Sequence, residues 1–250
     1  IDIVLEFPFI LSTQSSDYFA SNAISILNTI GVNHIICGCE SDDINNLHNF
    51  YELENSDTFK EIFKDNLKKY TSYKKTFEST MKYLTIDNEL ISLFNKPNFT
   101  LAYQYYKSIR KINPTMKMSL IKRTNSYDDE NLSSNIVSAK AIRLARINNL
   151  NYTKYLPFDE QLIDLNYAYQ KLLDITKYVC LTKTNFSNTI NDEGIINYII
   201  KNYVNTSSYS ELINSLTNKR YSKSRINRTI LYMLLDIKEF YHNYKYLRLL

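Results

Sequence analysis

The chain has 250 residues, of which 44% are hydrophobic, and this is enough to bury a substantial core in one large or two small domains. Its formal net charge of +4 permits a nucleic-acid partner without requiring one, and no apolar run reaches the roughly 18 residues of a membrane span. With only three glycines, the composition disfavours an all-β sandwich rich in tight turns and favours helices.

The first forty residues are predicted to form a βαβ unit. An apolar, β-rich segment covers 1–9, helical spacing follows over 12–31, and a second short strand covers 32–38. Two strands joined by one helix over so few residues indicate parallel pairing. Gly38 would then lie just past the carboxyl end of a parallel strand, at the edge where open α/β sheets bind ligands.

Helical periodicity continues through most of the first 150 residues. It predicts a long helical stretch over 56–84, a short helix after it, a break at Pro97 and a resumed helix beyond. The segment 114–123 has strand character and ends on Arg123. A polar loop then leads to a further helix that opens at Ser138.

From residue 159 onward the pattern is helical throughout. The first of these helices carries an apolar stripe made of Leu162, Leu165, Tyr169, Leu172 and Ile175. The change of pattern predicts a parallel-sheet α/β domain over 1–155 and an all-α domain over 156–250.

The residues alone indicate no self-sufficient catalytic group. The histidines at positions 34, 48 and 242 are far apart, and none has a carboxylate or cysteine at catalytic spacing. Neither a Walker loop nor a glycine-rich dinucleotide turn occurs in the sequence. Three cysteines, Cys37, Cys39 and Cys180, form no metal-ligand pattern, and their odd number is typical of a reducing cytosol, so we expect a cytoplasmic protein without a metal site.

One group of residues is suited to polyphosphate. Gly38 follows the second strand, Arg123 ends the third, and Ser138 opens a helix with Arg143 one turn inside. The free N–H groups of a helix N-terminus, a hydroxyl and two guanidinium groups would together bind phosphate oxygens. A capped helix on the protein surface has the same spacing, and the residues alone leave both interpretations open.

A second group is basic and lies near the C-terminus. Its members are Lys219, Arg220, Lys223, Arg225 and Arg228. They surround a predicted helix start that Ser222 or Ser224 can cap. A basic helix start with hydroxyl groups suits an RNA backbone, and a solvated helix face is the alternative.

Four blocks of the sequence resemble the bacterial tRNA(Met) cytidine acetate ligase family. They are IDIVLEFPFILSTQSSDYFASNAISILNTIGVNHIICGCESDD, KPNFTLAYQYYKSI, VSAKAIR and NKRYSKSRINRTILYMLL. The family reads E-L-P-F, T-Q-S-A-D-x-F-A and F-G-S-E in the first block. It reads P-N-N-x-L-G-x-x-Y, S-A-T-A-I-R and T-K-R-Y-T-x-S-R-I-x-R in the other three. The blocks occur in the family's order and span essentially the whole chain.

The resemblance implies a nucleotidyltransferase-type, Rossmann-like α/β domain followed by a helical tRNA-binding domain. It also implies an enzyme that uses ATP, with Mg²⁺, to convert acetate to acetyl-adenylate and then acetylates the wobble cytidine of elongator tRNA(Met). The ATP contacts implied by the matching positions are Gly38, Asn98, Arg123, Ser138 and Arg143. The implied tRNA contacts are the five basic residues between positions 219 and 228.

Three positions depart from the family's pattern. Phe99 stands at the second asparagine of P-N-N, so an ATP contact made by that asparagine would be lost. Lys140 replaces the threonine of S-A-T-A-I-R and adds a charge, and Cys39 replaces the serine of F-G-S-E.

The family's catalytic motif is expected upstream of Ile1. The family begins with a strand and an H-x-G-H motif whose histidines stabilise the transition state at the α-phosphate. We therefore expect no catalytic residue in this chain and no ATP turnover by the chain alone. Either the chain is part of a longer enzyme, or the gene has lost this half of the site. The alternatives are a nucleotidyltransferase of the same fold acting on a small metabolite and a non-catalytic tRNA-binding remnant.

Overall fold

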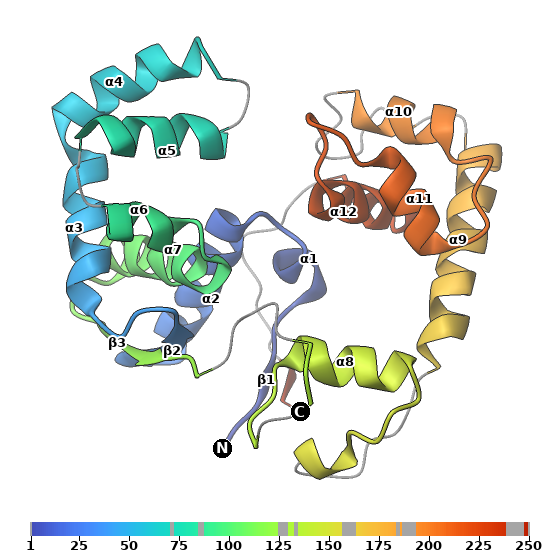
Figure 1. Ribbon diagram of the computed structural model, residues 1–250, viewed down its shortest axis with the longest axis horizontal. Helices are drawn as coiled ribbons and strands as arrows, with labels where there is room; N and C mark the ends of the chain where they lie inside the picture. The colour runs from blue at the N-terminus through green and yellow to red at the C-terminus, as the bar shows by residue number, and fades with distance from the viewer. Residues whose placement is uncertain are drawn as a thin grey trace. The chain divides into compact units, whose positions relative to one another are not determined.

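The computed structural model describes residues 2–70, 73–84, 88–124, 130–132, 135–156, 164–183, 186, 194–238 and 248–249 (Figure 1). The chain forms two compact units, unit 1 with Ile1–Ala141 and Leu247–Leu250, and unit 2 with Ile142–Tyr246. In the described part of the chain, no helix combines the length and the apolar character needed to cross a membrane.

A two-stranded parallel sheet in unit 1 carries the predicted ligand edge. Strand β2 (His34–Cys39) pairs in parallel with β3 (Lys117–Lys122), and His34 is opposite Lys117. The backbone N–H of Arg123 extends the pairing by donating to the carbonyl of Cys39 at 2.8 Å. The predicted parallel sheet is confirmed, but Gly38 does not lie past the strand end: it is the penultimate residue of β2 and pairs with Ile121.

The first strand differs from the prediction. Strand β1 covers only Leu5–Glu6 and pairs antiparallel with β4 (Arg248–Leu249). Among the described residues, β1 is not part of the sheet formed by β2 and β3, so the predicted βαβ unit beginning at residue 1 is wrong. Pro8, which has no N–H to donate to a neighbouring strand, is the N-cap of the next helix and limits the extended segment.

Seven helices are described in unit 1. They are α1 (Phe9–Ser12), α2 (Ser16–Thr29), α3 (Ile44–Asn55), α4 (Asp57–Leu67), α5 (Tyr73–Leu84), α6 (Asn88–Phe94) and α7 (Pro97–Ile112). Gly31 follows α2 with a φ of +83°, a left-handed conformation that favours glycine at a helix end. The helical stretch predicted over 56–84 is two helices, α4 and α5, which lie side by side (Figure 1).

The core of unit 1 is built from aromatic rings and the inward side of the sheet. Phe77 and Phe94 stack with their centroids 4.2 Å apart, and Phe50 and Phe99 meet edge to face at 5.6 Å. Cys37 and Cys39 belong to this core, and burial raises the pKa of the Cys37 thiol to about 11. The thiol therefore stays protonated near neutral pH and behaves as a small apolar side chain.

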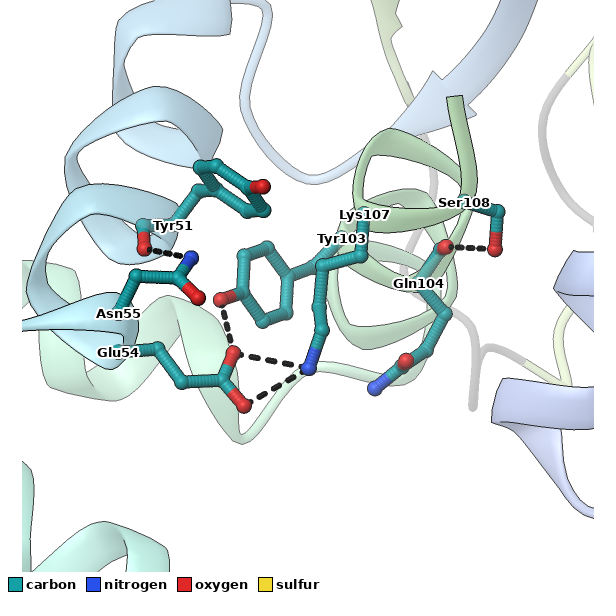
Figure 2. A network of polar contacts seen from close by, with 7 residues as sticks. All are labelled: Tyr51, Glu54, Asn55, Tyr103, Gln104, Lys107 and Ser108. Atoms are coloured by element: carbon teal, nitrogen blue, oxygen red, sulfur yellow. Dashed lines mark hydrogen bonds and ion pairs between the residues drawn. The ribbon is translucent and has the colours of Figure 1, made fainter. Parts of the chain in front are cut away.

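A polar network ties α3 to α7 (Figure 2). The Glu54 carboxylate accepts hydrogen bonds from Lys107 Nζ at 2.7 and 2.9 Å and a further one from the Tyr103 hydroxyl. Only 16% of the Glu54 side chain is exposed, and the ammonium group of Lys107 also lies 5.5 Å from the centre of the Tyr103 ring. Removing the charge of Glu54 would therefore leave two donors poorly satisfied in a low-dielectric setting.

We expect the substitution Glu54→Gln to lower the free energy of unfolding by about 1–3 kcal/mol, the range for hydrogen bonds that involve a charged group. Urea denaturation followed by circular dichroism measures this change. Asp57→Asn is the matched control, because Asp57 pairs with Lys60 on the surface and its side chain is 95% exposed. Equal denaturation midpoints for the two variants would show that the network contributes nothing to stability.

Unit 2 is helical in every described element, as predicted for the C-terminal part, but strand β4 at the end of the chain belongs to unit 1 and is not helical. The helices of unit 2 are α8 (Ala139–Ile147, with its first turn in unit 1), the short 3₁₀ helix η1 (Thr153–Tyr155), α9 (Leu165–Thr182), α10 (Ile195–Asn202), α11 (Tyr209–Leu216) and α12 (Lys223–Leu234). Leucine, isoleucine and tyrosine side chains from α10, α11 and α12 form the buried core of this unit with one side of α9.

The buried side of α9 differs in part from the predicted one. Leu173, Thr176 and Cys180 are its buried residues, and they face the core that includes α11 and α12. Tyr169 and Ile175 are 49% and 50% exposed, whereas Leu172 packs against the core, so the predicted apolar stripe coincides only in part with the buried side. Leu162, its first member, lies outside the described residues.

Candidate functional site

Gly38 and Arg123 lie against each other at the carboxyl end of the parallel sheet. A Cβ atom added to Gly38 would lie 3.6 Å from Cγ of Arg123, and this is an ordinary van der Waals distance. Both residues are exposed. The structure thus places the long, positively charged side chain of Arg123 beside a glycine, at the sheet edge where the sequence predicts ligand binding.

Glu40 joins this sheet end to the start of α7. Its carboxylate accepts from the backbone N–H and the side-chain amide of Asn98 at 3.2 and 2.8 Å, and from the backbone N–H of Phe99 at 2.6 Å. A carboxylate is stabilised at a helix N-terminus, where the first N–H groups have no intrahelical acceptor. The amide oxygen of Asn98 has no partner among the described residues and is available to a ligand.

The sequence interpretation missed Glu40. Its only signal is its place in the segment CGCE, directly after the strand, where the family has F-G-S-E. Phe99, the departure from P-N-N, is fully buried, so its side chain belongs to the core and only its backbone N–H takes part in this arrangement.

Of the other two predicted phosphate-binding residues, Ser138 directly precedes α8 in unit 1 and Arg143 lies within α8 in unit 2. Ser138 caps this helix, because its Oγ accepts from the backbone N–H of Ala141 at 2.9 Å. Arg143 is exposed one turn into the helix. Lys140, the residue that adds a charge to the family's pattern, forms an ion pair with Glu130 at 2.8 Å. The structure therefore brings Gly38 close to Arg123 and, separately, ties Glu40 to Asn98, and it confirms the predicted helix start at Ser138.

The basic group of unit 2 surrounds a buried tyrosine. The guanidinium groups of Arg220 and Arg225 lie 5.2 and 5.5 Å from the centre of the Tyr221 ring, and Tyr221 is 5% exposed. Cation–π contacts of this kind hold the two cations in place. Ser222 caps α12 by accepting from the backbone N–H of Arg225, as predicted.

The remaining cations of the group differ in exposure. Lys219 and Lys223 are exposed, Arg228 is half-buried, and none of the three has an acidic partner among the described residues. Of the five predicted residues, two thus contact the Tyr221 ring, and the other three have no acidic partner among the described residues. This arrangement can neutralise phosphates spaced along a backbone.

The histidines are placed away from this sheet end. His34 Nε2 lies 2.9 Å from the hydroxyl of Ser119, and His48 Nδ1 lies 3.3 Å from the hydroxyl of Tyr106. His242 lies outside the described residues. No group of three or more histidine, cysteine, aspartate or glutamate side chains within the described part of the chain is placed to hold a metal ion.

Comparison with known proteins gives consistent results. A family model described as HIGH Nucleotidyl Transferase matches residues 1–250. The chain is 35% identical to a tRNA(Met) cytidine acetate ligase of Clostridium perfringens (strain SM101 / Type A), over 96% of this chain and 64% of the relative. It is 32% identical to the protein of the same name from Caldicellulosiruptor saccharolyticus, over 95% of this chain and 62% of the relative. The chain therefore spans less than two thirds of the length of these relatives.

Solved structures show the same fold. Crystal structures of Thermotoga maritima TmcAL match with TM-scores of 0.80 without ligand and 0.75 with bound alpha-thio ATP, each at 23% sequence identity. The matches cover 96% of this chain and 62% and 61% of the respective structures. The resemblance identified from the four sequence blocks is confirmed, and the chain belongs to the HIGH nucleotidyl transferase family.

Proposed function

We propose that this chain is the part of an ATP-dependent ligase that binds nucleotide and tRNA, and that the ligase acetylates the wobble cytidine of elongator tRNA(Met). The observation that carries the proposal is the juxtaposition of Gly38, Arg123 and the Glu40–Asn98 pair at the carboxyl end of a parallel sheet. The names of the curated relatives and the alpha-thio ATP bound to T. maritima TmcAL support it.

The proposed reaction has two steps. A carboxylate oxygen of acetate attacks the α-phosphorus of ATP, so that acetyl-adenylate forms and pyrophosphate leaves. The exocyclic amine of the cytidine then attacks the acetyl carbonyl, loses a proton, and releases AMP. Arg123 would neutralise phosphate charge, and Gly38 would let the nucleotide approach the sheet backbone closely. Ser138 and Arg143 are proposed to bind phosphate from the start of α8.

Mg²⁺ is proposed to enter with ATP. The Glu40 carboxylate already accepts three hydrogen bonds from the start of α7, and the described residues contain no cluster of metal ligands. Mg²⁺ is commonly held by nucleotide phosphates with only one or two protein carboxylates. When bound, it would offset the negative charge of the triphosphate. The cytoplasmic location expected from the sequence fits these substrates and stays a prediction.

The basic group of unit 2 is proposed to bind tRNA phosphates. Its five cations lie at the start of α12, and phosphate contacts position a nucleic acid without reading its sequence. The identity of the tRNA is therefore proposed from the names of the relatives and not from these residues.

The proposed function is tested with the full-length protein in two assays. Acetate-dependent exchange of labelled pyrophosphate into ATP measures the first step, and transfer of labelled acetate to tRNA(Met) measures the second. Exchange that requires an organic acid other than acetate would favour the small-metabolite nucleotidyltransferase. Binding of tRNA without any exchange would favour the non-catalytic remnant.

We expect Gly38→Ala to raise the KM for ATP in the exchange assay at least several-fold while leaving the fold intact. The added methyl group meets Arg123 at an ordinary 3.6 Å, so protein packing tolerates it, but it takes up space where the nucleotide would approach the sheet. The thermal midpoint should stay within about 2 °C of the parent. An unchanged KM would mean that the nucleotide does not pass over Gly38.

A further inference from the structure

A second cavity in unit 1 lies away from the proposed nucleotide edge. It has a volume of about 490 Å³, is open to solvent, and is lined by β3, the first half of α3 and the second half of α7. His34 and Lys117, the first residues of β2 and β3, contribute to its wall, whereas Gly38 and Arg123 lie at the other end of the same strands. Its size is in the usual range for small-molecule sites.

The fully charged side chains that line this cavity are both cations. Arg110 and Lys117 both line it, and none of its described lining residues is an aspartate or a glutamate. The ammonium group of Lys117 has no partner among the described residues. Arg110 donates from Nε and Nη2 to the hydroxyl of Tyr106, at 3.0 and 2.8 Å, and its other N–H groups have no acceptor in the described part of the chain.

Two of the chain's three histidines complete the polar part of the wall. The Tyr106 hydroxyl accepts from Arg110, so its own proton can be donated to His48 Nδ1 at 3.3 Å. A neutral His48 in this arrangement carries its proton on Nε2 and can donate it to a ligand. His34 Nε2 contacts the hydroxyl of Ser119 at 2.9 Å, which leaves Nδ1 of His34 for another partner. The acidic group facing His48 is Glu52, at 3.8 Å.

The rest of the wall is apolar. Ile109 and Met116 are 3% and 4% exposed and line the cavity together with further aliphatic and thioether side chains. Arg110 and Lys117 are exposed, and they line the same space as the half-buried side chains of Ile44 and Met118. A phosphate or carboxylate group would satisfy the donors, and an apolar body attached to it would cover the aliphatic surface.

We propose that this cavity binds a small organic anion, a phosphate ester or carboxylate with an apolar body, at a site separate from the nucleotide edge. Arg110 and Lys117 provide the charge, His48 and the Ser119 hydroxyl provide further hydrogen bonds, and Ile44 and Met118 contact the apolar body. The proposal concerns residues that the proposed ligase reaction does not use, and it stands or fails independently of that reaction.

The test uses phenyl phosphate as the probe and the histidine rings as reporters. The ring ¹³C–¹H resonances of His34 and His48 are assigned from the variants His34→Gln and His48→Gln. Titration of the parent protein with phenyl phosphate should shift both resonances with a saturable dependence on concentration. Inorganic phosphate should bind at least several-fold more weakly, because it lacks an apolar body. The absence of saturable shifts, or equal affinity for the two probes, would overturn the proposal.

Charge-removing variants separate this cavity from other anion sites. The double change Arg110→Gln and Lys117→Gln should raise the Kd for phenyl phosphate by roughly tenfold or more. Lys111→Gln is the matched control, because Lys111 is exposed on the same helix but does not line the cavity. Arg123→Gln should also leave the titration unchanged, since Arg123 lies at the opposite sheet end. Equal loss of binding in the controls would overturn the assignment to this cavity.

Discussion

Replacing Arg123 by glutamine in the full-length protein is expected to slow acetate-dependent pyrophosphate exchange by roughly ten- to a hundredfold. The reason is the loss of a charge-assisted contact to phosphate, which costs about 1.5–3 kcal/mol. If the contact is made in the transition state, this corresponds to one to two decades in rate. The position of Arg123 against Gly38, where the parallel strands end, motivates the choice of this residue.

Lys122→Gln is the control for this prediction. Lys122 is the last residue of β3, it is exposed, and successive side chains on a strand point to opposite faces. The two variants therefore remove the same charge one residue apart. Similar exchange rates in both would show that Arg123 acts only through general electrostatics, and the nucleotide would have to be placed elsewhere.

The second large effect is expected for tRNA binding. The double change Lys219→Gln and Lys223→Gln should weaken binding and flatten its dependence on salt. Both lysines are exposed without a described acidic partner, so their replacement should not disturb the packing of Tyr221 by Arg220 and Arg225. Each lost phosphate contact should lower the slope of log affinity against log salt by about 0.7–0.9.

Fluorescence anisotropy at several salt concentrations measures this slope. Lys171→Gln with Lys201→Gln is the matched double variant, since both lysines are exposed elsewhere in unit 2. Pyrophosphate exchange without tRNA should stay unchanged in both double variants. If the two pairs have the same salt slope as the parent, the basic group is a solvated helix face and the small-metabolite alternative gains support.

The parts of the fold that depend on local pattern were predictable. The helix predicted over 12–31 is present as α2, which is followed by Gly31 in a left-handed conformation, and the strand predicted over 32–38 is present as β2. The parallel sheet was predicted from a βαβ unit that began at residue 1, whereas the parallel partner of β2 in the structure is β3. The helix caps at Ser138 and Ser222 were also predictable, because the serine hydroxyl accepts a hydrogen bond from a backbone N–H group only three residues away.

The parts that depend on distant contacts were not predictable. Glu40 finds its partners at Asn98 and Phe99, and no short-range spacing encodes a contact across so much of the chain. The length of the first strand was overestimated because residues 1–9 are apolar. A strand also needs a neighbouring strand to pair with, and hydrophobic periodicity does not indicate which segment that is. In α9, apolar residues occur on more than one side, so only the packing of the other helices selects the side of Leu173.

The carboxylate of Glu40 has a consequence for how a nucleotide would lie along the sheet edge. Because the start of α7 already holds one negative charge, a phosphate that approached this helix would meet repulsion instead of the attraction that a bare N-terminus provides. The neutral amide oxygen of Asn98 favours an uncharged donor, such as an exocyclic amine of a base. Under the proposed function, the same edge would have two unlike ends, with the base at Asn98 and the phosphates at Arg123. This polarity would fix the direction in which a nucleotide lies.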